Sequence, residues 1–587
     1  MAVAKTNTFG SCEKVQAWLA KRRVLRAAAF CITQLRWTNS VQGQVARELK
    51  RRAMFGAEQN RKSESGSAMS QKSTADLRSA TNAERIDEFL GKWKSWIAVG
   101  CCCFAVLRVL AFAAAFPLIN PVDEASHYGT VYSYAAGKLP GSELPKTEPE
   151  LARVFALYGS SEYFKTREVL RTFHKDMPMA ELPRELQEAQ YPKAFKFWSD
   201  QSNIEEQSPP VYYLIAASWY RAGKEIGLRD WSIAYWVRFL NAILYGAFVW
   251  LAYRFVREVY PERAFLCVGV PLLLAVFPQD VFYGVNRDVL SPLLAAGFLL
   301  MLFRALRAES GGHREALAAG LLAGLAFLTD VSNVVLFGTL IVGLQVKSRK
   351  VEKLGNPGNE QTMIALSFAA AVALPALWLA RNRLVTGDLT GSQAKIFYLG
   401  WVPKPFAEIW RHPIFTFDGA GHFLHELING FWRGELVWAG GPLRNALAER
   451  FYLLSTLVLM AAFLIHFIVR RTAESPLQRL NGQFSVYQVA ASVFFMGAIS
   501  LLFDFQECVY PSRAWPYFIS GRIIIGALLP FAVLYLSGFE VLMRPVREYV
   551  HPIIPLLLIC FAITWVEVTL TATVFQSHFN FYALRKM

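Results

Sequence analysis

The feature that most constrains this chain is a series of eleven long apolar blocks separated by polar segments. Each block holds roughly 15–25 residues, and about 20 helical residues at a rise of 1.5 Å cross a hydrocarbon layer of about 30 Å. A soluble helix would instead show polar residues every few positions. The sequence therefore predicts an all-α polytopic membrane protein with about eleven transmembrane helices. The blocks are 95–117, 233–253, 264–278, 289–304, 315–329, 332–346, 361–380, 450–469, 485–503, 519–540 and 551–575.

Basic residues gather in every second loop between these blocks, and few occur in the loops between. Cytoplasmic loops of membrane proteins carry the excess of lysine and arginine. This alternation predicts a multi-pass protein of the plasma (inner) membrane with a cytoplasmic N-terminus and an outside C-terminus. The basic positions are Lys92, Lys94, Arg254, Arg257, Arg263, Arg304, Arg307, Arg314, Lys347, Arg349, Lys350, Lys353, Arg470, Arg471, Arg479, Arg544 and Arg547.

The orientation divides the chain into three parts. Residues 1–94 form a basic tail that we expect to be mostly disordered, with a helix near 83–94 leading into the membrane. Residues 95–575 form the transmembrane domain, with two long outside loops at 118–232 and 381–449, and 576–587 form a short outside tail. The first part has 18 basic and 8 acidic residues and so supplies +10 of the net +16, which gives little support for nucleic acid binding.

The apolar stretch Pro209–Tyr220 lies within the first outside loop. Its 12 residues are too few to span a bilayer, and a span here would reverse the side of every later loop. We expect a helix in the outer membrane interface, with its tyrosine and tryptophan side chains at the level of the lipid headgroups.

The sharpest polar motif is Asn120-Pro-Val-Asp-Glu-Ala-Ser-His127, directly after the first apolar block. In a helical turn Asp123 and His127 share a face, and Glu124 lies close to His127. A carboxylate here suits a general base that accepts a proton from a hydroxyl group. The alternative is a polar helix cap at the interface. A metal site would need further ligands from elsewhere in the chain.

A second acidic motif, Asp280-Val-Phe-Tyr-Gly-Val-Asn286-Arg287-Asp288, lies in the next outside loop. Polar residues at membrane depth are costly and usually face a cavity. Loop capping, together with a salt bridge between Asp288 and Arg287, is the alternative interpretation.

Arginines near the outer face are candidates to bind phosphate. Arg522 lies about one turn into an apolar block, so it should pair with an acid or an anionic ligand, and Arg381 is the second candidate. Arg108 lies deeper, and we expect it to pair with Asp330 or Asp504.

These motifs together resemble the GT-C superfamily of membrane glycosyltransferases, which includes protein mannosyltransferases and the enzymes that add aminoarabinose to lipid A. The resemblance covers roughly 95–540 and is closest to an uncharacterised bacterial family of predicted membrane proteins. It is carried by four motifs in chain order: Pro121-Val-Asp-Glu-Ala-Ser-His127, Pro209-Pro-Val-Tyr212-Tyr213, Asn286-Arg-Asp288, and Gly521-Arg522 followed by Leu529-Pro530.

The resemblance implies an inverting transferase that moves a sugar from a polyprenyl-phosphate donor at the outer face. Asp123 would be the base, and Glu124 and His127 would orient it or contact the acceptor. Asp288 would match the second acidic position, so the expected catalytic residues are Asp123, Glu124 and Asp288. An arginine should stabilise the charge on the leaving phosphate. The expected substrate-binding residues are His127, Tyr212, Tyr213, Asp280, Asn286, Arg381 and Arg522.

The partners implied are a lipid-linked sugar donor, membrane lipids, and a glycan, lipid or protein acceptor, with no nucleic acid. No cofactor is expected; a divalent metal is possible but not indicated by these motifs. The competing function is a membrane transporter, or a handler of lipid-linked glycans without transferase activity. Transporters place charged residues near the bilayer midplane on broken, repeated helices, whereas these acids cluster at one face.

Overall fold

A computed structural model describes residues 82–160, 177–308, 312–352, 358–438, 441–469, 475–505 and 516–586. Positions 1–81 of the basic tail, which we expected to be mostly disordered, lie outside the described residues. The predicted helix near 83–94 is confirmed, because it is the first part of the helix that contains the first apolar block.

Every apolar block forms a helix, and the chain is an all-α polytopic membrane protein. Within the described residues, nine helices are long and apolar enough to cross a membrane. The blocks at 264–278 and 315–329 form the two shorter helices, α10 and α12. The eleven helices are α3 (Asn82–Ala115), α9 (Asp230–Val259), α10 (Ala264–Ala275), α11 (Ser291–Arg307), α12 (His313–Phe327), α13 (Val335–Glu352), α14 (Gly358–Thr386), α18 (Ala446–Val469), α19 (Pro476–Leu502), α20 (Leu528–Met543) and α21 (Ile553–Leu570).

Successive helices run in opposite directions, which places the two long loops at the same end. At one end, Lys94 at the start of α3 donates to the Pro261 carbonyl at 3.0 Å, and Asp87 pairs with Arg547 at 2.6 Å. At the other end, the backbone amide of Val211 in the first long loop donates to the Leu328 carbonyl after α12. The alternation predicted from the basic loops is therefore present in the fold.

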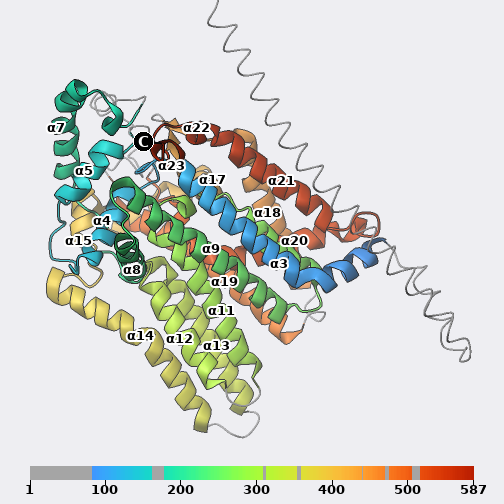
Figure 1. Cartoon of the computed structure of the whole chain (residues 1–587). Coiled ribbons are helices and arrows are strands. Elements are labelled where there is room, and N and C mark those ends of the chain that lie inside the picture. The colour runs from blue at the N-terminus through green and yellow to red at the C-terminus, as the bar shows by residue number, and fades with distance from the viewer. Residues whose placement is uncertain are drawn as a thin grey trace, which may run out of the picture. The chain divides into compact units, whose positions relative to one another are not determined.

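The long loops fold into short elements at the end opposite Lys94, and Figure 1 shows α4, α5, α7 and α8 gathered there beside the start of α9. Helix α8 matches the predicted interfacial segment. The helices of the long loops are α4 (Glu124–Ala135), α5 (Pro149–Tyr158), η2 (Met179–Glu181), α7 (Arg184–Asp200), α8 (Val211–Glu225), α15 (Gln393–Tyr398), α16 (Phe406–Ile409), η6 (Pro413–Phe415) and α17 (Phe417–Arg433). Two short helices, α22 (Ala572–Phe575) and α23 (Phe581–Leu584), follow α21. Two short antiparallel strand pairs are also present: β1 (Val402–Pro403) with β4 (Phe503–Asp504), and β2 (Val437–Trp438) with β3 (Gly441–Pro442).

One part of the prediction for α8 is wrong. Tyr212 and Tyr213 are fully buried rather than placed at lipid headgroups. The reason is that α8 packs between α4 and α9, so its tyrosine face meets protein. Trp219 stacks on Trp236 of α9, with ring centroids 4.3 Å apart.

Three membrane helices begin with a 3-10 turn at the end that carries the long loops. These turns are η4 (Arg287–Leu290) before α11, η5 (Val331–Val334) before α13 and η7 (Gly521–Ala527) before α20. Both η4 and η5 pack against η7. Gly521 makes a close approach possible, because a Cβ there would lie 2.1 Å from the Phe431 backbone nitrogen of α17. Three helix starts thus meet at one point below the long loops.

Candidate active site

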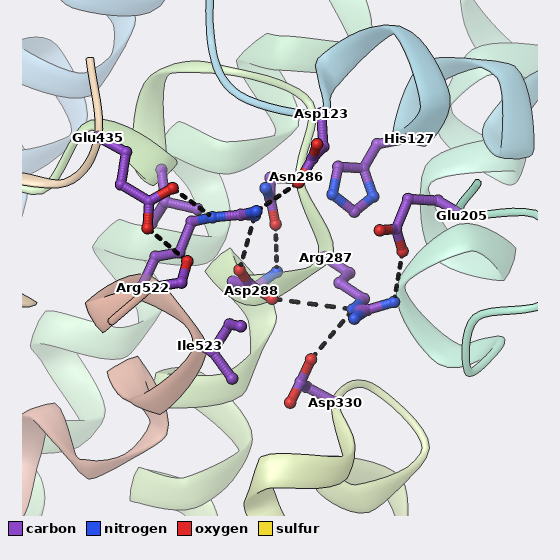
Figure 2. Close-up of polar contacts among 12 residues, drawn as sticks. Asp123, His127, Glu205, Asn286, Arg287, Asp288, Asp330, Glu435, Arg522 and Ile523 are labelled. Atoms are coloured by element: carbon purple, nitrogen blue, oxygen red, sulfur yellow. Dashed lines mark hydrogen bonds and ion pairs between the residues drawn. The ribbon is translucent and has the colours of Figure 1, made fainter. Parts of the chain in front are cut away.

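Arg522 is the centre of the polar cluster at this meeting point (Figure 2). Its guanidinium pairs with Asp123 after α3, with Asp288 of η4 at 3.3 Å and with Glu435 after α17 at 3.6 Å. The expectation that Arg522 pairs with an acid is confirmed. Asp123 and Asp288, which lie 165 positions apart in the sequence, therefore contact one arginine.

Arg287 forms the second half of the cluster. It contacts Glu205 at 2.7 Å and Asp330 at 3.1 Å, while Asp288 is 3.8 Å away. Lys395 of α15 also pairs with Glu205. Burial alone would raise the pKa of Glu205, but the neighbouring Arg287 and Lys395 outweigh it and bring that pKa well below its ordinary range. Glu205 is therefore an ionised carboxylate inside the protein.

His127 points into the space between Asp123 and Glu205 (Figure 2). Its Nδ1 atom lies 2.7 Å from the Tyr213 hydroxyl, and its Nε2 atom is buried with no hydrogen-bond partner among the described residues. Burial lowers the pKa of His127 to about 3, so the imidazole is neutral at physiological pH. The predicted proximity of Asp123 and His127 is present.

The backbone before α4 is strained at the candidate base. Asp123 has φ 61° and Ile119 has φ 67°, and positive φ is unusual for any residue other than glycine, especially a β-branched one. Such strain persists only where surrounding contacts hold it, and it is common at functional sites. Here Glu124 accepts a hydrogen bond from the Ile119 backbone nitrogen at 2.8 Å.

Glu124, the sequence neighbour of Asp123, makes its contacts outside the arginine cluster. Its carboxylate pairs with Arg238 of α9, which is itself 0% exposed, and accepts from the Val285 backbone nitrogen at 2.9 Å. Arg238 also donates to the carbonyls of Ala113 and Pro117 at the end of α3. This geometry gives Glu124 the role of a structural link between α3, α9 and the loop after α10.

The residues of the second acidic motif also have separate roles. Asn286 caps η4 by accepting from the Asp288 backbone nitrogen at 2.9 Å, and so positions Asp288. Asp280 lies outside the cluster and accepts from the Glu435 backbone nitrogen at 2.9 Å. Burial, with a further contribution from the nearby Glu435, raises the pKa of Asp280 to about 7.

Three other residues named from the sequence lie apart from the arginine cluster. Tyr212 reaches Asn241 of α9 at 3.5 Å. Arg381 packs over Trp378 and donates to the Pro140 carbonyl. The expected partner of Arg108 was wrong: Arg108 pairs with Glu567 of α21 at 2.6 Å, whereas Asp330 pairs with Arg287.

Sequence reasoning missed three members of the cluster, Glu205, Lys395 and Glu435, and gave a fourth, Asp330, the wrong arginine as its partner. Glu205 belongs to an acidic pair, Glu205-Glu206, four residues before Pro209. An acidic pair so close to the Pro209-Pro-Val-Tyr212-Tyr213 motif of an outside loop was the available sequence signal for a site residue. Asp330 begins the two-residue loop between the blocks 315–329 and 332–346, where an acid has no charged sequence neighbour.

The cluster as a whole carries an excess of negative charge. Five carboxylates (Asp123, Glu205, Asp288, Asp330 and Glu435) face three cations (Arg287, Arg522 and Lys395). Asp288 and Glu205 are almost completely buried, whereas a quarter of the Asp123 side chain is exposed. The arrangement can accept a proton at Asp123 and can offer arginine donors to an anion. With all eight side chains ionised the formal charge is −2, and it remains negative when one carboxyl is protonated, so the cluster also favours a cation.

Comparison with solved structures finds archaeal oligosaccharyltransferases. An oligosaccharyltransferase AglB from Archaeoglobus fulgidus, solved with an inhibitory peptide and a dolichol-phosphate, is 12% identical with a TM-score of 0.36. The match covers 82% of this chain and 56% of that one. A crystal structure of an Archaeoglobus fulgidus oligosaccharyltransferase in the apo form is also 12% identical, with a TM-score of 0.35 and coverage of 81% and 56%. This chain thus spans little more than half the length of either archaeal chain.

No curated protein matches this sequence significantly. A family model with the description "Predicted membrane protein (DUF2142)" matches residues 106–504. That range begins within α3, includes both long loops and ends at Asp504 after α19. It contains every member of the cluster except Arg522. The chain belongs to this family of predicted membrane proteins.

Proposed function

We propose that the chain is a membrane glycosyltransferase that moves a sugar from a polyprenyl-phosphate donor to an acceptor at the outer face. The single observation that carries the proposal is the joint contact of Asp123 and Asp288 with Arg522. An inverting transfer from a lipid phosphate needs a base for the acceptor and fixed positive charge for the leaving group. The cluster holds both within contact distance at the ends of membrane helices.

In the proposed reaction, the Asp123 carboxylate takes the proton of an acceptor hydroxyl. The acceptor oxygen attacks the anomeric carbon from one face, and the bond between that carbon and the phosphate oxygen breaks on the other. The electron pair stays on the lipid phosphate, and Arg522 exchanges its contact with Asp123 for a phosphate oxygen, which frees the Asp123 carboxylate to act on the opposite face of the sugar. Asp288 and Glu435 hold the guanidinium in place while this exchange occurs.

The distribution of basic residues supports the proposal that the site lies at the outer face. The ends of the helices away from the cluster carry Arg257, Arg263, Arg304, Arg307 and Arg544, and cytoplasmic loops are the basic ones. Helices α14 and α18 expose most of their membrane-spanning surface, whereas the span Gly521–Val546 is almost fully buried. The prenyl chain of the donor would therefore contact peripheral helices while its phosphate reaches Arg522 at the start of the central one.

The test is the substitution Asp123→Asn in the full chain, reconstituted in proteoliposomes. The assay follows release of free polyprenyl phosphate from a panel of polyprenyl-phosphate sugars, with extracted envelope material as the acceptor. We expect release with wild-type protein and loss of at least about 10²-fold with Asp123→Asn, because general base catalysis contributes about 10²–10⁴-fold. The matched control is Asp200→Asn, because the Asp200 side chain is 54% exposed and lies in α7. Equal release by wild type and Asp123→Asn would remove Asp123 as the base.

One observation favours the competing function of a transporter or lipid-linked glycan handler. Arg108 and Glu567 form an ion pair within two membrane helices, and ionised residues at such depth often mark a pathway. The Arg108 guanidinium also donates a hydrogen bond to the Tyr283 hydroxyl at 2.6 Å. A transporter would move a labelled lipid-linked sugar across the proteoliposome membrane without releasing polyprenyl phosphate, so the same preparation distinguishes the two functions.

A further inference from the structure

We propose that Asp123, His127 and Glu205 bind one divalent transition-metal ion, of the Mn²⁺ or Zn²⁺ type. One ligand atom from each of the three side chains lies within 4.8 Å of the other two. Asp123 and His127 come from the start of α4, and Glu205 comes from the far end of the same long loop. Glu205 is thus the additional ligand from elsewhere that the sequence motif alone lacked. The proposal concerns ion binding and does not depend on the proposed sugar transfer.

The imidazole of His127 is the observation that points to a ligand. Its side chain is 1% exposed, and its Nε2 atom is buried without a hydrogen-bond partner in the described parts of the chain. An unsatisfied buried polar atom costs about 1–3 kcal/mol of stability in general, so native structures contain few of them. A metal ion bound to Nε2 would satisfy this atom.

Tyr213 completes the geometry expected around a metal-bound histidine. Its hydroxyl lies 2.7 Å from Nδ1. In the tautomer in which Nδ1–H donates to this hydroxyl, the lone pair of Nε2 faces Asp123 and Glu205. A histidine ligand almost always donates from its other ring nitrogen in this way, which fixes the orientation of the ring.

The charge of the surroundings also fits a divalent cation. The five carboxylates outnumber the three cations of the cluster, so the formal charge is −2 when all are ionised and stays negative when one carboxyl is protonated. Asp123 contacts Arg522 through Oδ2, and Glu205 contacts Lys395 and Arg287 through Oε1 and Oε2. A carboxylate has about four lone-pair positions, so each can accept a metal ion beside its basic partner. The exposed quarter of the Asp123 side chain provides access from the outer side.

The donor set selects the type of ion. Two carboxylates and one imidazole suit Mn²⁺ or Zn²⁺, whereas Ca²⁺ and Mg²⁺ prefer oxygen ligands alone. An ion at this position would also share the neutralisation of Asp123 with Arg522. That sharing would make the guanidinium more available to an anion, which links the ion site to the neighbouring arginine.

The experiment measures Mn²⁺ binding to the full chain in detergent, purified with a tag that contains no histidine and stripped with EDTA. The signal of free Mn²⁺ in electron paramagnetic resonance falls as the ion binds. We expect about one ion per wild-type chain and competition by Zn²⁺. We expect His127→Gln to weaken binding at least tenfold and Tyr213→Phe to weaken it about 10–100-fold, as for other partners of metal-bound histidines. The matched control is His425→Gln, because His425 is an outer-loop histidine beside Glu426 and should leave binding unchanged.

Folding is separated from binding by a second measurement. Glu205→Gln removes a partner of both Arg287 and Lys395. Its Mn²⁺ binding is therefore compared with wild type only if the variant elutes as a single peak and melts cooperatively, and His127→Gln decides the proposal otherwise. His127→Gln removes no charge, and we expect its melting temperature without metal to match wild type while the Mn²⁺-dependent rise disappears. The proposal is overturned if wild type binds no ion near a ratio of one, or if His127→Gln binds Mn²⁺ as tightly as wild type.

Discussion

Replacing Glu124 should destabilise the protein strongly, even though its neighbour Asp123 is the candidate base. Glu124 is 3% exposed and pairs with the fully buried Arg238. Its carboxylate also accepts from the backbone nitrogens of Ile119 at 2.8 Å and Val285 at 2.9 Å. The substitution Glu124→Ala would leave a buried guanidinium without its counter-ion and two backbone donors without acceptors.

The magnitude follows from these contacts. Removing one partner of a buried ion pair costs about 3–5 kcal/mol, because the remaining charge stays in a low-dielectric environment. Each unsatisfied buried donor adds about 1–3 kcal/mol, although these costs are not additive. Arg238 keeps its backbone acceptors at Ala113 and Pro117, which limits the loss. We therefore expect the free energy of unfolding to fall by at least about 3 kcal/mol.

The assay is reversible unfolding in mixed detergent micelles, followed by tryptophan fluorescence. The control is Asp123→Asn, in which an amide replaces a partly exposed carboxylate, and it should change stability far less. The double variant Glu124→Leu with Arg238→Met should recover part of the loss, because an apolar pair leaves no buried charge. If Glu124→Ala were as stable as Asp123→Asn, the structural role of Glu124 would be refuted.

Two further predictions concern the neighbouring groups. Burial raises the pKa of Asp280 to about 7, so the folded state holds a proton that the unfolded state releases near pH 4. The free energy of unfolding should therefore fall as pH rises from about 4 to about 7. Equilibrium unfolding at several pH values should show a flatter dependence for Asp280→Asn than for wild type. A dependence that persists in Asp280→Asn would assign it to another group. Arg522→Lys should lower polyprenyl phosphate release about 10²–10³-fold, because one ammonium group cannot bridge Asp123 and Asp288 as the planar guanidinium does, and unchanged release would exclude Arg522 from the reaction.

Most of the fold could be predicted from the sequence, because hydropathy in a membrane protein is a local property of the chain. All eleven apolar blocks form helices, and the loops alternate between two ends as the basic residues indicated. The environment of α8 could not be predicted in the same way. Its sequence, rich in tyrosine and tryptophan, suits a lipid interface, but α4 and α9 cover that face and bury Tyr212 and Tyr213.

The site could be predicted only in part, because its charges pair across long sequence separations. Local motifs indicated Asp123, Asp288 and Arg522, and the structure brings these three side chains together. Glu205 and Glu435 lie within loops whose paths no local pattern specifies. Arg108 shows the same limit, since its partner Glu567 is 459 positions away. Sequence reasoning can state that a buried arginine needs an acid, but packing determines which acid it meets.

The two adjacent acids of the first motif show why sequence proximity is a poor guide to shared function. Asp123 adopts a left-handed backbone conformation, and α4 begins at Glu124, so the two side chains point in different directions. Asp123 faces Arg522 and His127, while Glu124 faces Arg238 and the strained turn at Ile119. The strain at Asp123 therefore depends on contacts made by its neighbour. In a relative that keeps the glutamate but lacks the aspartate, we expect the loop to retain its shape and the transfer activity to be absent. The presence of the aspartate, and not of the glutamate, would then predict activity.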